Sequence, residues 1–133
     1  MSKEKSCADR VDHVWSKVKE DLTAYMLGSA PNDNLGPFHE YALGFDYVPK
    51  GTWEDQKHGY WRYQMSYGGP SDEVRFFLGY TDIRKRMPRA EYWFLDWYDG
   101  ANLNVTDEAC VVWLWDQLLD SGAVRAEFMK SRD

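Results

Sequence analysis

The chain has 133 residues, the size of one domain, which is enough to bury a hydrophobic core without disulfides. Its composition, 44% hydrophobic and 29% charged, is typical of a soluble globular protein, and no apolar run is long enough to span a membrane. The net charge of −6 disfavours direct binding to DNA or RNA, which depends on basic surface. We therefore expect a single cytoplasmic domain over residues 1–133, with no membrane contact.

The first predicted element is an amphipathic helix that begins after Ser6 and ends before Gly28. Ser6 and Asp9 have the spacing of a capping box, with aspartate in place of the usual glutamate. Apolar side chains then recur every three or four residues, as on a helix that packs on a core. They are Val11, Val14, Trp15, Val18, Leu22, Tyr25 and Met26.

Four β-strands are predicted next, because apolar and polar residues alternate over 38–48, 60–67 and 73–80 and because 91–98 is dense in aromatic residues. The cluster 68–72 contains two glycines and a proline, which predicts a hairpin turn between the second and third strands. Short connections of this kind favour an antiparallel sheet.

Two helices are predicted to close the chain. A loop with Asn102 and Asn104 leads to a helix over 106–121 with Thr106 as its N-cap, and a short helix follows over 123–130. The fold class is therefore α+β, with an antiparallel sheet of about four strands. The N-terminal helix and the C-terminal helices are expected to cover one face of that sheet.

The stretch 91–98 holds five aromatic residues in the seven positions from Tyr92 to Tyr98, interrupted by Asp96 and followed by Asp99. Two carboxylates near a strand end can hold Mg²⁺ or share a proton, so both are candidates for catalysis. The structural alternative is that Asp96 accepts hydrogen bonds, or that it pairs with Arg62 or Arg75 across the sheet. The pattern contains no third ligand at a suitable spacing, and we predict no metal or cofactor.

Charge is unevenly spread along the second half of the chain. Residues 91–120 contain seven carboxylates and no lysine or arginine, directly after a basic run. One interpretation is an ordinary solvated surface; the other is a docking surface for a charged partner. The candidate binding residues are Trp113, Asp116, Asp120, Asp107, Glu108, Arg84, Lys85, Arg86 and Arg89.

Trp113 is placed by helical spacing among acidic residues, away from the predicted core face. It either packs under the C-terminal segment or serves as an interface anchor, a role in which tryptophan is enriched. Three other patterns favour structural roles. The first is the three scattered histidines, His13, His39 and His58, and the second is Cys110, which follows two acidic residues. The third is the glycine pair in 68–70, which lacks the rest of a phosphate-binding loop.

Two stretches, 66–77 (SYGGPSDEVRFF) and 91–101 (EYWFLDWYDGA), resemble small accessory proteins of phages, plasmids and other mobile elements. The resemblance implies a context of anti-CRISPR or anti-restriction function, in the cytoplasm of a host cell. It transfers no catalytic residue. The implied partner is a host protein or ribonucleoprotein complex with a basic surface.

Three hypotheses follow. The first is a binding protein that inhibits a host defence complex by docking through the acidic and aromatic surface. The second is a metal-dependent hydrolase or transferase that uses Asp96 and Asp99. The third is a carbohydrate- or nucleotide-binding module on an aromatic face of the sheet, for which the aromatic residues of strand 60–67 are the candidates. The oligomeric state is left open.

Overall fold

The computed structural model describes residues 6–28, 36–53, 56–77 and 87–131. Its first helix, α1 (Cys7–Met26), begins at the predicted capping box. Asp9 donates its backbone N–H to Ser6 Oγ at 3.2 Å, and Ser6 donates its own N–H to Asp9 Oδ2 at 3.3 Å. The stripe that α1 buries contains Cys7, Val11, Trp15, Val18 and Leu22.

The sheet has five strands, all antiparallel, in the order in which they occur along the chain. They are β1 (Gly44–Val48), β2 (Tyr60–Ser66), β3 (Ser71–Phe77), β4 (Arg89–Asp96) and β5 (Asp99–Asn104). The predicted α+β class is therefore confirmed. β4, which carries most of the aromatic stretch, lies inside the sheet with neighbours on both sides, whereas β1 and β5 are the edge strands.

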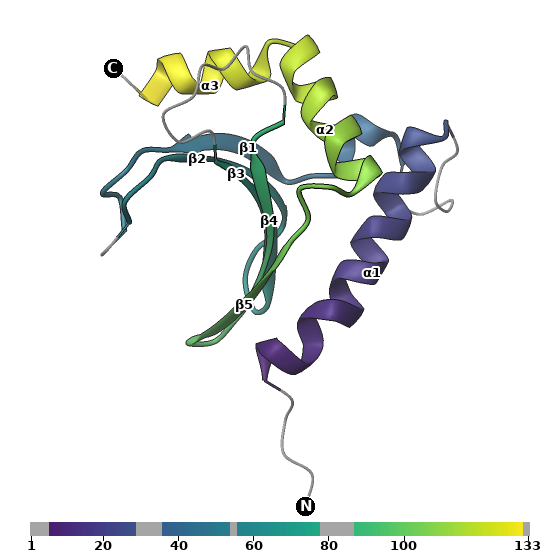
Figure 1. The fold of residues 1–133 in the computed structure, drawn as a ribbon, viewed down its shortest axis with the longest axis vertical. Coiled ribbons are helices and arrows are strands. Elements are labelled where there is room, and N and C mark those ends of the chain that lie inside the picture. The colour runs from purple at the N-terminus through teal and green to yellow at the C-terminus, as the bar shows by residue number, and fades with distance from the viewer. Residues whose placement is uncertain (1–5, 29–35, 54–55, 78–86, 132–133) are drawn as a thin grey trace, which may run out of the picture.

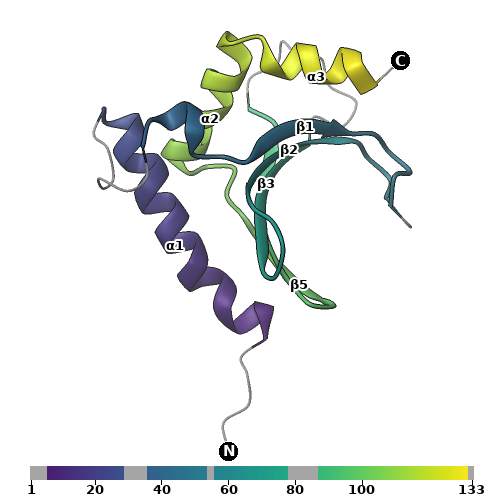
Figure 2. The same cartoon turned by 180° about the vertical axis from the view of Figure 1, so that it is seen from behind.

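The sheet is strongly curved, and the helices lie along its convex side (Figures 1 and 2). These helices are α1, α2 (Ala109–Asp120) and α3 (Ala123–Ser131), and a short 3-10 helix, η1 (Phe38–Glu40), precedes β1. Within the described residues, no helix is both long and apolar enough to cross a membrane. The concave face carries none of these helices.

Large aromatic side chains join the helices to the sheet. Trp115 of α2 packs on Phe76 and Trp61, with ring centres 4.8 and 5.7 Å apart, and Trp15 of α1 packs on Tyr92 at 5.1 Å. All five are buried, and burying a side chain of this size contributes about 2–3 kcal/mol. The high aromatic content thus serves mainly to fill the space between the two layers.

The fifth strand corrects the prediction of about four. Residues 99–104 contain glycine and asparagine, which strands disfavour, so 102–104 read as loop, yet they pair in register with β4. The first predicted strand is also shorter, because 38–40 form η1 and β1 starts at Gly44. The third spans 71–77 rather than 73–80, and residues 78–80 lie outside the described part of the chain.

Thr106 is not the N-cap of α2, which begins at Ala109 after Glu108. Its hydroxyl oxygen instead accepts a hydrogen bond from the N–H of Ala90 at 2.9 Å. Thr106 thereby fastens the end of β5 to the start of β4.

Candidate functional site

Two aromatic residues form the turn between β4 and β5. Because Asp96 pairs with Asp99 across the hairpin, only Trp97 and Tyr98 connect the two strands. Trp97 has a φ of 55°, a left-handed backbone conformation that is unfavourable for residues other than glycine. Trp97 is 86% exposed and Tyr98 is fully exposed. The hairpin therefore presents two large aromatic side chains to solvent.

A third exposed aromatic residue lies at the same end of the sheet. Tyr67, which is 80% exposed, begins the turn between β2 and β3. Ser71 at the start of β3 pairs with Leu95 near the end of β4, so the two turns lie at one end of the sheet (Figures 1 and 2). We call Tyr67, Trp97 and Tyr98 the aromatic tip. Exposed aromatic residues gathered in this way are typical of an interaction surface.

The base of the β4–β5 hairpin is joined to α1 by two carboxylates. Asp96 Oδ2 accepts a hydrogen bond from Arg10 Nη1 at 2.6 Å, and the same guanidinium lies 4.7 Å from the centre of the Phe94 ring. Asp99 Oδ2 accepts the N–H of Cys7 at 2.7 Å, in the first turn of α1, where a carboxylate complements the helix dipole. This hydrogen bond lowers the pKa of the Asp99 carboxyl. Two hydrogen bonds to α1 therefore fix the position of the hairpin that carries Trp97 and Tyr98.

The two sequence candidates for catalysis, Asp96 and Asp99, thus both accept hydrogen bonds from α1. The expected pairing of Asp96 with Arg62 or Arg75 is wrong, because Asp96 faces α1 while both arginines lie on the opposite, concave face. Among the described residues, no three His, Cys, Asp or Glu side chains are grouped so as to hold a metal ion.

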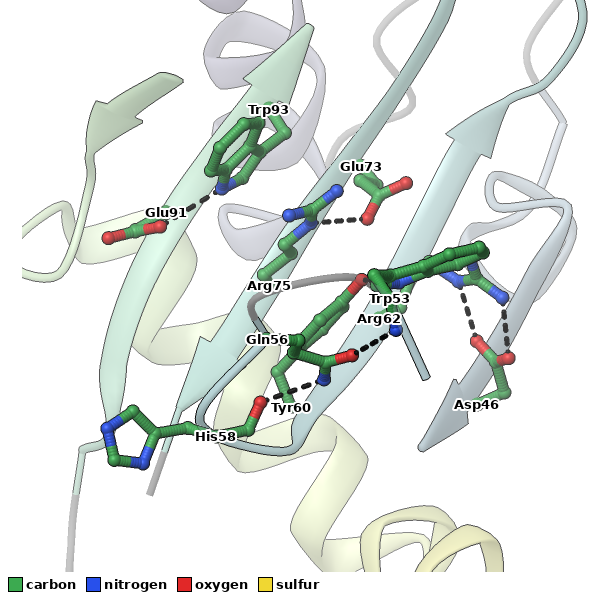
Figure 3. Close-up of polar contacts among 10 residues, drawn as sticks. All are labelled: Asp46, Trp53, Gln56, His58, Tyr60, Arg62, Glu73, Arg75, Glu91 and Trp93. Carbon is green, nitrogen blue, oxygen red and sulfur yellow. Dashed lines mark hydrogen bonds and ion pairs between the residues drawn. The ribbon is translucent and has the colours of Figure 1, made fainter. Parts of the chain in front are cut away.

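The concave face carries a network of charged and aromatic side chains (Figure 3). Asp46, Arg62, Arg75 and Glu91 are in register across four adjacent strands. Arg62 donates two hydrogen bonds to Asp46, from Nε at 3.0 Å and from Nη2 at 2.7 Å. Two arginines directly opposite each other repel, and the carboxylates that flank them offset this repulsion.

Arg75 lies at the centre of the network. Its Nε donates to Glu73 Oε2 at 2.7 Å, and its guanidinium carbon lies 4.1 Å from the Trp93 ring centre and 4.8 Å from that of Tyr60. Glu73 is only 2% exposed, and a carboxylate this buried requires a charged partner. Trp93 Nε1 donates to Glu91 at 3.0 Å. The polar groups of this face therefore largely bind one another.

Trp113, the anchor candidate on α2, is half-buried, and its ring packs edge-on against Phe38 of η1 at 4.8 Å. The acidic residues around it are more open to solvent: Asp107, Asp116 and Asp120 are exposed. A hollow of about 490 Å³ lies nearby, lined mainly by apolar side chains from residues 38–45, β2 and α2. Trp113 is thus part of the packing between η1 and α2, and its role as an interface anchor stays a prediction.

Glu108 is half-buried and forms an ion pair with Lys19 of α1 at 2.9 Å. The tertiary structure thereby brings a lysine to a region that has none in the sequence. Of the basic run, Arg84, Lys85 and Arg86 lie outside the described residues. Arg89 is exposed at the start of β4 and donates to Glu91 at 2.7 Å.

The chain matches no protein-family model, no curated protein and no solved structure.

The aromatic tip is the candidate surface that the sequence did not predict. Reading 91–98 as one strand placed Trp97 and Tyr98 inside the sheet. The sequence does contain a pattern that predicts β5: Ala101 and Leu103 alternate with two asparagines, as apolar and polar residues do in a strand. With strands on both sides, the residues at 97 and 98 must form the turn, and turn residues are exposed.

Proposed function

We propose that this protein binds another protein through the aromatic tip, and that the partner is a component of a host defence complex. The observation that carries the proposal is the exposure of Trp97, Tyr98 and Tyr67 at one end of the sheet. Tryptophan and tyrosine are enriched among the residues that dominate binding energy in protein interfaces. The two stretches that resemble mobile-element proteins, 66–77 and 91–101, contain all three residues.

The construction of the tip supports a specific contact. The hydrogen bonds of Asp96 and Asp99 to α1 hold the hairpin in place before any partner arrives. A prearranged surface binds more tightly because little conformational freedom is lost on association. The residues of the tip carry no charge, and their hydroxyl and indole groups can donate hydrogen bonds at the rim of an interface.

A protein is favoured over two other targets that exposed aromatic residues can contact. Anionic membranes and nucleic acids both repel a chain with a net charge of −6. A basic protein surface is attracted by the same charge, and electrostatic attraction of this kind speeds association. The exposed Asp107, Asp116 and Asp120 add to the attraction without having to lie in the interface.

The test uses tagged wild-type protein as bait in bacteria that carry a CRISPR or restriction system. Two readouts are taken: the proteins that copurify, and the efficiency with which phage infects. We expect the double variant Trp97→Ser/Tyr98→Ser to lose both a stoichiometric partner and protection of the phage. The control is Leu27→Ser, which removes an exposed apolar residue elsewhere, at the end of α1, and should retain both.

A third variant separates the tip from the surface on α2. Asp116→Asn/Asp120→Asn neutralises two exposed carboxylates and should leave partner recovery largely intact at moderate salt. If this variant abolishes binding and the tip variant does not, the docking surface is α2 and the assignment to the tip is wrong. Binding of the wild-type chain to anionic vesicles, lost in the tip variant, would also contradict a protein partner.

A further inference from the structure

β5 leaves one side of its backbone unpaired. Val105 donates its N–H to the carbonyl of Ala90 at 2.9 Å, and the register with β4 is regular from this point to the turn. Antiparallel hydrogen bonds alternate along a strand, so residues 99, 101, 103 and 105 bond inward to β4. The N–H and C=O groups of Gly100, Asn102 and Asn104 therefore point outward from the edge of the sheet.

Little on this edge prevents another strand from pairing with it. The N–H of Gly100 is taken by its neighbour Asp99, at 2.9 Å. Within the described residues, no backbone group pairs with the outward groups of Asn102 and Asn104. Natural sheets guard such edges with charges, prolines or bulges, and residues 100–104 have no charge, no proline and no break in register.

The side chains of β5 also leave apolar surface uncovered. Ala101 and Leu103, on the helix side of the sheet, are only half-buried. Their neighbours on β4, Tyr92 and Phe94, are almost completely buried beneath α1. A further strand beside β5 would place its own side chains next to Ala101 and Leu103 on the same face of the sheet. Part of the apolar surface of these two residues would then be removed from water.

We propose that β5 pairs with β5 of a second copy of this chain, antiparallel, about a twofold axis at Asn102. The Asn102 N–H would then donate to the C=O of the second copy's Asn102, and the N–H of that residue would donate to the C=O of the first. Each Asn104 N–H would meet the carbonyl of Gly100 across the axis, and the two five-stranded sheets would become one. Cyclic dimers with a twofold axis are the commonest homo-oligomers.

Charge is the reason for choosing a second copy as the partner. Identical strands place identical residues opposite or near one another, so a charged edge would repel itself, whereas 100–104 is neutral despite the net charge of −6. In this register Asp99 lies opposite Val105, and the two Asp99 carboxylates fall at opposite ends of the shared ladder. The two aromatic tips would also lie at opposite ends of the joined sheet, where dimer formation leaves both of them exposed.

The first test removes the outward N–H. Asn102→Pro deletes a donor that the β4–β5 ladder does not use and places the proline ring at the edge, where proline is tolerated. Sedimentation velocity from micromolar to submillimolar concentration should show dimers for the wild type and for Asn102→Ala, and monomers for Asn102→Pro. A wild type that stays monomeric throughout, or a folded Asn102→Pro that dimerises equally well, overturns the proposal.

The second test does not depend on how well the proline variant folds. Directly paired residues in such a ladder have Cα atoms about 5.5 Å apart, a separation that a disulfide can bridge. Asn102→Cys should therefore form a covalent dimer under mild oxidation, while the native Cys7 and Cys110 are buried. Asn104→Cys is the matched control and should not link to itself, because it faces Gly100. Equal crosslinking at both positions, or none at 102, refutes the register.

Discussion

Replacing Trp97 by glycine should make the free protein more stable. Trp97 has a φ of 55° and is 86% exposed, so its side chain adds backbone strain and little packing. A residue other than glycine in the left-handed region costs about 1–2 kcal/mol, and the greater freedom of glycine in the unfolded chain offsets about 0.5–1 kcal/mol of that. The net gain is therefore about 0.5–1 kcal/mol, or roughly 2–4 °C in Tm for a chain of this size.

Urea and thermal unfolding, followed by circular dichroism, measure this directly. Trp93→Gly is the matched control on the same hairpin, because the Trp93 ring stacks on Arg75 and its indole donates to Glu91. The control should lose several kcal/mol, since large-to-small changes at packed sites cost about 3–5 kcal/mol when the site is fully buried. If Trp97→Gly instead loses 1 kcal/mol or more, the Trp97 side chain packs in the fold and is not held out for a partner.

Two further predictions concern hydrogen bonds that hold the fold. Tyr92→Phe removes the hydroxyl that donates to Asp72 Oδ2 at 2.6 Å and should lower the free energy of unfolding by about 1.5 kcal/mol in urea titrations; an unchanged midpoint would contradict this. The N–H of Cys7 lowers the pKa of the Asp99 carboxyl in the folded protein. The ionised carboxylate should therefore stabilise the fold at any pH above the ordinary aspartate pKa of about 3.9, and this stabilisation should be lost as the pH falls through the lowered pKa of the folded state. Asp99→Asn should therefore be less stable than the wild type at pH 7 and similar to it at the lowest pH, and a difference that persists at low pH would refute the assignment.

Local signals in the sequence were sufficient for the existence of the three helices and for the fold class. The capping box at Ser6 and Asp9 depends on residues three positions apart, and the buried stripe of α1 follows from helical periodicity alone. The alternation in 60–67 likewise depends on neighbours within one strand. Features of this kind were predicted and confirmed because the residues that produce them are close in the chain.

The site depended on contacts between distant residues. Arg10 and Asp96 are 86 positions apart, and no pattern in either segment indicates that they meet. Two tryptophans that both have acidic neighbours in the sequence also differ in exposure. Trp113, the anchor candidate, is half-buried against Phe38, whereas Trp97, which was predicted to lie in a strand, is exposed. Sequence by itself determined that the helices exist, where four of the five strands lie approximately, and where apolar side chains are available. Only the tertiary structure decided which of those side chains remain in water, because burial depends on what the rest of the chain packs against each position.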